Sequence, residues 1–60
     1  MNQAIKIVVV DDHPLMRKGI VQFLTIEPEF EVVAEAGSGA QAVEICSEIE
    51  PDIVLLDLNM

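Results

Sequence analysis

The chain has 60 residues, a formal net charge of −8, one cysteine and one histidine. A chain of this length holds one small domain at most. Its 11 acidic and three basic side chains argue against direct binding to nucleic acid or to an anionic membrane, because phosphate groups would be repelled. The single cysteine excludes a disulfide framework and a multi-cysteine zinc site.

Targeting and membrane signals are also missing from the sequence pattern. The first residues do not resemble a signal peptide, and the apolar run at residues 7–10 is too short for one. No stretch approaches the roughly 18 apolar residues of a membrane span. We therefore expect a cytoplasmic location and no membrane partner. A mean hydropathy of +0.45 still indicates enough apolar material for a core.

The first predicted element is a strand at residues 5–10. This run is β-branched and apolar on both faces, which is typical of a central strand in a parallel sheet. It stops at Asp11 and Asp12, which therefore follow the carboxyl end of the strand. Acids in this place are also common as helix caps, so the pair alone does not decide between a cap and a functional site.

A helix is predicted next, from Pro14 to just before Pro28. Proline suits the first helical position because the N–H that it lacks would have no partner there. Helical spacing of the apolar residues predicts a core-facing stripe at Met16, Ile20, Phe23 and Leu24. Arg17 and Lys18 fall on the exposed face in this prediction, and His13 is interpreted as a turn or cap residue.

Residues 30–36 alternate with a period of two and predict a strand that is solvated on one face, at the edge of the sheet. Glu31 and Glu35 fall on that solvated face. The following helix begins with a capping box, in which Ser38 is the N-cap and Gln41 lies three residues further on. The apolar stripe of this helix consists of Ala42, Ile45, Cys46 and Ile49.

Residues 52–57 predict a third strand, which is again apolar on both faces and ends in Asp57. Strands that alternate with helices indicate parallel pairing and right-handed crossovers. Because the second strand has the edge pattern and the other two have the buried pattern, the predicted spatial order is 2-1-3. The predicted fold class is therefore α/β, with the order β-α-β-α-β and one helix on each face of a doubly wound parallel sheet.

Three carboxylates would meet at one edge of this sheet. The order 2-1-3 places a topological switch point between the first and third strands, and ligands bind at the carboxyl ends of the strands beside such a point. Asp11, Asp12 and Asp57 would therefore share one crevice. Like charges at this spacing favour a bound cation, and an oxygen-only ligand set without imidazole suits Mg²⁺. A carboxylate beside Mg²⁺ can also attack phosphorus.

Three motifs in the sequence resemble those of a known family. They are residues 8–17, with the run Asp-Asp-His-Pro, the glycine-containing residues 34–42, and residues 52–60. Together they resemble the receiver domain of bacterial two-component response regulators. The likeness is strongest to the subgroup whose receiver precedes a LuxR-type helix-turn-helix domain, such as the nitrate/nitrite response regulators.

The resemblance implies the first half of a flavodoxin-like sheet, with residues 1–60 as a partial receiver domain and no second domain. It implies that Asp57 accepts a phosphoryl group from a histidine kinase. Asp11, Asp12 and Asp57, with the backbone carbonyl of Asn59, would hold Mg²⁺. The implied role is that of a signalling module and not an enzyme, in a protein that regulates transcription and binds DNA through a C-terminal domain absent here.

Two other interpretations stay open. In the first, the chain is a truncated or designed half-domain that serves only as a structural piece and self-associates through the exposed edge of its third strand. In the second, it is a haloacid-dehalogenase-like phosphatase, a family that also places an aspartate nucleophile after an apolar strand. That family has a second aspartate two residues later, where this sequence has Asn59.

Overall fold

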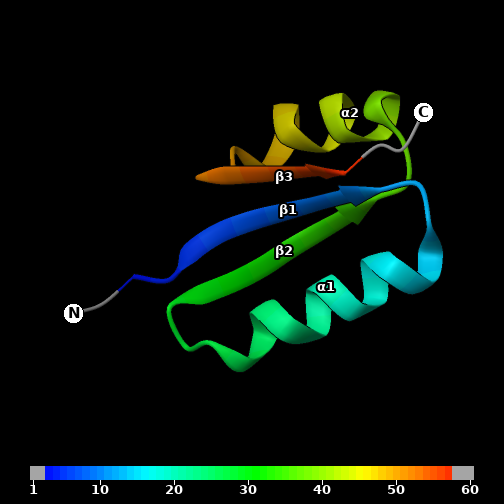
Figure 1. The fold of residues 1–60 in the computed structure, drawn as a ribbon. Coiled ribbons are helices and arrows are strands. Elements are labelled where there is room, and N and C mark those ends of the chain that lie inside the picture. The colour runs from blue at the N-terminus through cyan, green and yellow to red at the C-terminus, as the bar shows by residue number, and fades with distance from the viewer. Residues whose placement is uncertain (1–2, 58–60) are drawn as a thin grey trace.

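The computed structural model describes residues 3–57, which form a three-stranded sheet with one helix on each face (Figure 1). The elements are β1 (Ile5–Asp11), α1 (Pro14–Ile26), β2 (Phe30–Ala36), α2 (Gly39–Ile49) and β3 (Ile53–Asp57). The strands are parallel and lie in the order β2-β1-β3. The predicted fold class and strand order are therefore confirmed.

Both helices begin where the sequence predicts. Pro14 lies in the first turn of α1, and the Ser38 hydroxyl accepts the N–H of Gln41 at 3.2 Å at the start of α2. The Gln41 side chain in turn accepts the N–H of Gly37 at 2.8 Å, one residue further back than in the usual capping box. Neither helix of the described chain is long and apolar enough to cross a membrane.

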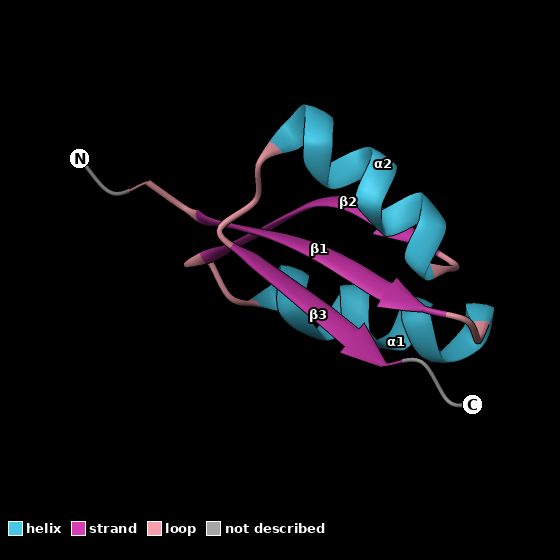
Figure 2. Cartoon of the chain, turned by 90° about the horizontal axis from the view of Figure 1, so that it is seen from above, coloured by secondary structure: helices cyan, strands magenta, loops and turns pink. Residues whose placement is uncertain are grey.

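The core is built on the two faces of β1, the central strand (Figure 2). Residues 7–10 are each at most 2% exposed. Val8 and Val10 pack towards α2, whereas Ile7 and Val9 pack towards α1. Both apolar clusters therefore contain residues of β1. The burial of this strand on both faces fixes the position of Asp11 at its carboxyl end.

β3 is as apolar as β1 but is exposed along its whole length. The prediction that it is buried on both faces is wrong, because in the described part of the chain the helices approach β1 and β2 but not β3. An apolar groove of about 550 Å³ remains between α2 and β3. Its lining consists of Gly39, Ala42, Val43, Cys46, Ser47, Val54 and Leu56.

Two side chains of α1 that were predicted in the core are exposed. Met16 is 55% exposed and Phe23 is 69% exposed. The apolar residues of α1 that pack on the sheet are Ile20, Val21 and Leu24. The helix is turned from its predicted position so that this apolar stripe faces the sheet, and Arg17 meets Glu35 of β2. Met16 and Phe23 consequently lie outside the stripe of α1 that packs on the sheet.

β2 contains one residue more than its pairing with β1 requires. The register skips a residue at Val33. A bulge of this kind reverses the alternation of side chains beyond it, so Val32 packs towards α1 whereas Val33 and Ala34 both pack towards α2. Glu31 and Glu35 therefore lie on opposite faces of the sheet, and the prediction that they share a face is wrong.

Candidate functional site

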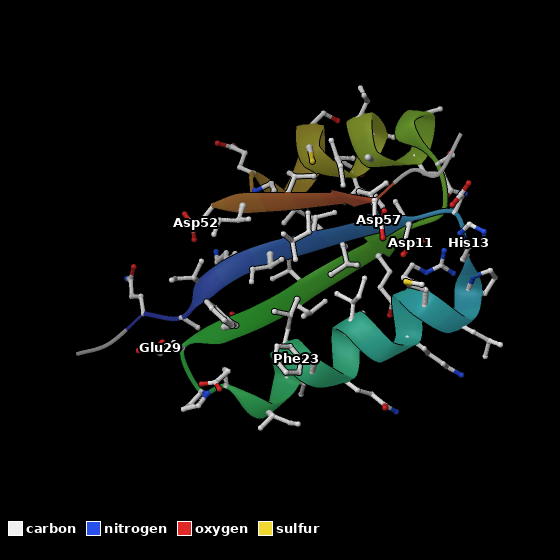
Figure 3. All side chains as sticks on the ribbon, in the orientation of Figure 1. Asp11, His13, Phe23, Glu29, Asp52 and Asp57 are labelled. Atoms are coloured by element: carbon white, nitrogen blue, oxygen red, sulfur yellow. The ribbon has the colours of Figure 1, made fainter. Side chains whose placement is uncertain are left out.

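Two aspartates lie side by side at the carboxyl ends of β1 and β3. Asp11 and Asp57 are register partners in these parallel strands, which puts their backbones about 5 Å apart. Figure 3 shows both residues at one end of the sheet and Asp52 at the opposite end. The edge that the strand order marks as a ligand-binding position thus carries an acid on each of two neighbouring strands.

Asp11 is the buried member of the pair, with 1% of its surface exposed. Its Oδ1 accepts the backbone N–H of His13 at 2.8 Å. Its Oδ2 is buried and has no hydrogen-bond partner among the described residues. A buried carboxylate oxygen without a partner is costly. A cation would satisfy this oxygen, so the site fits a metal ion.

His13 joins the two adjacent acids. Its Nδ1 lies 2.9 Å from Oδ1 of Asp12 and 3.6 Å from Oδ1 of Asp11. Ligand atoms of these three residues all lie within 4.8 Å of one another. His13 is the N-cap of α1, but its side chain makes no capping hydrogen bond in the described structure. The structure thus adds an imidazole beside two of the acids that the sequence predicts as an oxygen-only ligand set.

The sequence predicts two further ligands, Asp57 and Asn59. Asp57 is exposed and is not one of the residues whose ligand atoms lie within 4.8 Å of one another. Asn59 lies outside the described residues. The structure thus brings Asp11 and Asp12 together with His13, and it places Asp57 beside Asp11 in the sheet.

Arg17 connects the site to the rest of the fold, and the sequence prediction put it on the exposed face instead. Its Nη1 donates to the carbonyl oxygen of Asp11 at 2.9 Å, and its Nε donates to Oε1 of Glu35 at 3.2 Å. The Arg17 side chain is 23% exposed. From α1 it therefore bridges the carboxyl ends of β1 and β2. A signal was available, because Arg17 precedes the sheet-facing residues of α1 by three, four and seven positions.

Residues 7–60 match the family described as the response regulator receiver domain. The nitrate/nitrite response regulator protein NarP of Escherichia coli (strain K12) is 53% identical over 55 residues, which are 92% of this chain and 26% of NarP. The transcriptional regulatory protein DegU of Brevibacillus brevis is 50% identical over 56 residues, which are 93% of this chain and 24% of DegU. The chain thus spans about a quarter of the length of these relatives.

A solved structure has the same arrangement of elements. The signal receiver domain of the response regulator NarL from Mycobacterium tuberculosis superposes with a TM-score of 0.90 at 43% sequence identity. The match covers 97% of this chain and 47% of that one. The family match favours a receiver over the phosphatase interpretation. Sequence, topology and the acids at the carboxyl edge of the sheet agree, and the chain belongs to the response regulator receiver domain family.

Proposed function

We propose that this chain is the phosphoacceptor part of a response regulator, in which Asp57 receives a phosphoryl group from a histidine kinase. The observation that carries the proposal is the pairing of Asp57 with Asp11, whose buried Oδ2 lacks a partner among the described residues. Asp57 itself is exposed, so that a phosphodonor can reach it. A reachable nucleophile and a place for a cation therefore lie on adjoining strands.

The proposed reaction needs little from the protein beyond positioning. A carboxylate oxygen of Asp57 attacks phosphorus, the P–N bond of the kinase phosphohistidine breaks, and the imidazole leaves as an acyl phosphate forms on Asp57. Asp11 and Asp12 would hold Mg²⁺ together with Asp57 and the backbone carbonyl of Asn59. When bound, the ion offsets the negative charge of the phosphoryl group. Arg17 fixes the backbone of Asp11 through its carbonyl oxygen.

The output of the module follows from its relatives. NarP and DegU are named as a nitrate/nitrite response regulator and a transcriptional regulatory protein. We infer the same class of output for this chain, in the cytoplasm, with phosphorylation controlling a DNA-binding domain that lies outside these 60 residues. The net charge of −8 on these 60 residues supports the proposal that another domain binds DNA, because an acidic module would be repelled by DNA.

The test is a phosphorylation assay with a small donor. The chain is incubated with acetyl phosphate and Mg²⁺, and its intact mass is recorded. We expect an adduct of one phosphoryl group on the wild type and none on Asp57→Asn. Asp52→Asn is the matched control, because Asp52 lies at the opposite end of the sheet and should leave labelling unchanged (Figure 3). Equal labelling of Asp57→Asn, or no adduct on a chain that circular dichroism shows to be folded, would contradict the proposal.

The metal part of the proposal has its own test. Asp12→Asn removes one proposed ligand and should weaken Mg²⁺ binding about 10-fold or more in a calorimetric titration. Asp52→Asn again serves as the control, because it removes one negative charge from the same chain at a distance from the site. Unchanged Mg²⁺ affinity in Asp12→Asn would mean that the ligand assignment is wrong.

We also propose that two copies of the chain associate through β3. In residues 3–57 this strand pairs with β1 only, and its other edge offers free backbone groups beside exposed apolar side chains. A twofold axis would pair two such edges antiparallel, with Leu55 opposite the same residue of the second copy.

Sedimentation velocity over a range of concentrations tests this association. We expect a concentration-dependent dimer of the wild type. Leu55→Lys places a charge on the edge strand and should give a monomer. Leu15→Lys, at an 86% exposed position of α1, should dimerise as the wild type does. A wild type that is strictly monomeric at high concentration would contradict this part of the proposal.

A further inference from the structure

Arg17 contacts the candidate site at its backbone, through the carbonyl oxygen of Asp11. We propose that Arg17 is a positioning residue, which holds the peptide unit between Asp11 and Asp12 and thereby orients the two acids towards each other. The inference rests on the proposed function, because Mg²⁺ binding by these acids is one of the two measurements that reveal their orientation.

The carbonyl oxygen of Asp11 lies beyond the end of the pairing between β1 and β2. Backbone groups along a strand point alternately to its two neighbours. The N–H of Ile5 bonds towards β2, so the odd-numbered residues of β1 direct their carbonyl oxygens to that side. The pairing with β2 ends at Val10 and Ala36. Arg17 therefore supplies the donor that a longer β2 would have supplied.

The peptide unit that contains this carbonyl joins the two acids. Because a peptide unit is planar, a bond to its oxygen fixes the direction in which Asp12 leaves Asp11. Nη1 of Arg17 makes this bond at 2.9 Å. The N–H of His13 fixes the next step of the chain, because it donates to Oδ1 of Asp11 at 2.8 Å. Ligands that are held in place beforehand lose less conformational freedom on binding, which raises affinity.

Glu35 of β2 holds Arg17 at a second point. Nε of Arg17 donates to Oε1 of Glu35 at 3.2 Å. A long side chain with many rotamers is not fixed by one acceptor alone, whereas the planar guanidinium is fixed when two of its nitrogens are bound. The Glu35 side chain is 44% exposed, and an ion pair this exposed adds little to stability. Its importance lies in where it holds the guanidinium.

Gly37 leaves room for the guanidinium just after β2. A Cβ atom on Gly37 would lie 3.2 Å from Nη1 of Arg17 and 3.6 Å from Oε1 of Gln41. The first separation is tighter than nearly all contacts of real Cβ atoms, so a side chain here would displace the guanidinium. The φ angle of Gly37 is not positive, so the backbone accepts an alanine. An alanine at this position therefore disturbs Arg17 without straining the chain.

The first experiment is a calorimetric titration of Mg²⁺ into the wild type and variants of Arg17. Arg17→Gln removes the charge, whereas Arg17→Lys keeps it on one nitrogen that cannot replace the two nitrogens of the fork. We expect both variants to bind Mg²⁺ about 10-fold more weakly, because residues that orient metal ligands typically contribute this much. Lys18→Gln removes the same charge one residue later and should change the affinity less than about 2-fold. Wild-type affinity in Arg17→Lys would refute the positioning role.

The second experiment disturbs Arg17 through its neighbours. Glu35→Ala should weaken Mg²⁺ binding about 2- to 5-fold, as the loss of a half-exposed ion pair implies. Glu35→Gln keeps an acceptor for Nε and should stay within about 2-fold of the wild type. Gly37→Ala should also weaken binding, whereas Gly39→Ala should not, because a Cβ there meets nothing within 4 Å. Equal losses in the two Glu35 variants, or in the two glycine variants, would contradict the proposal.

The third experiment observes the peptide unit directly and needs no ion. The carbonyl ¹³C signal of Asp11 and the amide ¹⁵N signal of Asp12 respond to a hydrogen bond on this carbonyl. We expect both signals to shift in Arg17→Lys and to stay in place in Lys18→Gln. Unchanged signals in a variant that circular dichroism shows to be folded would overturn the proposal. Gly37→Ala makes the same test if substitution of Arg17 prevents folding.

The two proposals fail in distinguishable ways. A wild type that binds no Mg²⁺ would refute the proposed metal site, and the signals of the Asp11–Asp12 peptide would then decide on Arg17 alone. Mg²⁺ binding that depends on Asp12 but is unchanged in both Arg17 variants would refute the positioning role and leave the metal site standing.

Discussion

β1 and β3 are neighbouring parallel strands with nearly the same composition, and each ends in an aspartate. Five residues of one pair in register with five of the other, from Ile7 and Ile53 to Asp11 and Asp57. The β1 residues are at most 2% exposed, whereas Leu56 in β3 is 64% exposed. Position causes the difference, since β1 has a strand on each side and a helix on each face. A two-sided apolar pattern thus shows that a strand tolerates burial, and its neighbours decide whether it is buried.

The aspartates at the ends of these two strands also differ in burial. Asp11 ends the buried strand and has an oxygen without a partner among the described residues, while Asp57 ends the exposed strand. The buried carboxylate is the proposed ion ligand, and the exposed carboxylate is the proposed phosphoryl acceptor. The two roles proposed for these residues follow from the two environments.

A charge placed in each strand should give the largest contrast. Val10→Asp puts a carboxylate at a position that is 0% exposed, which costs several kcal/mol. A chain of this size is stable by roughly 3–9 kcal/mol, so we expect cooperative unfolding to be lost. Leu56→Asp, at the register partner, should cost less than about 1 kcal/mol. Thermal unfolding followed by circular dichroism checks both, and equal effects would break the comparison.

Truncation of paired valines should give a smaller contrast. Val8→Ala removes methyl groups from a fully buried side chain, and we expect a loss of about 2 kcal/mol in the free energy of unfolding. Val54→Ala removes the same groups at the paired position in β3, where the side chain is 38% exposed. It should cost less than about 1 kcal/mol. Urea denaturation measures the two losses, and a larger loss at Val54 would show that β3 is covered in solution.

The aspartates should show the smallest effect, and its sign should depend on the metal. Without Mg²⁺, Asp11→Asn should stabilise the chain by about 1 kcal/mol, because it removes a buried charge with an unpaired oxygen. Asp57→Asn should change stability by less than about 0.5 kcal/mol. Mg²⁺ at about ten times its Kd should add about 1.4 kcal/mol to the wild type and far less to Asp11→Asn. Urea denaturation with and without Mg²⁺ checks this, and equal gains in both proteins would exclude Asp11 as a ligand.

Local patterns in the sequence were enough to predict the elements and their order. The β-branched runs, the proline at the start of α1 and the capping residues of α2 are all signals that neighbouring residues determine. Burial of β3 could not be predicted in this way, because it depends on where the two helices cross the sheet. Met16 and Phe23 were misplaced for a related reason, since the rotation of α1 depends on which of its apolar residues pack on the sheet.

One part of the candidate site could be predicted from the sequence, and another part could not. The strand ends predicted that acids would gather at one edge of the sheet, because chain direction and strand order suffice for that inference. The approach of His13 to its neighbouring acids is set by the conformation of a turn and by its side-chain torsions. No spacing in the sequence encodes these features.

The extra residue at Val33 reverses the face of the sheet that each later residue of β2 occupies. Upstream of it, odd-numbered residues face one helix, and downstream they face the other. Glu35 reaches Arg17 only because of this reversal. Regular pairing of β2 without the bulge at Val33 would turn Glu35 towards α2 instead of α1. The contact between Arg17 and Glu35 therefore depends on the bulge in β2 as much as on the identity of the two residues.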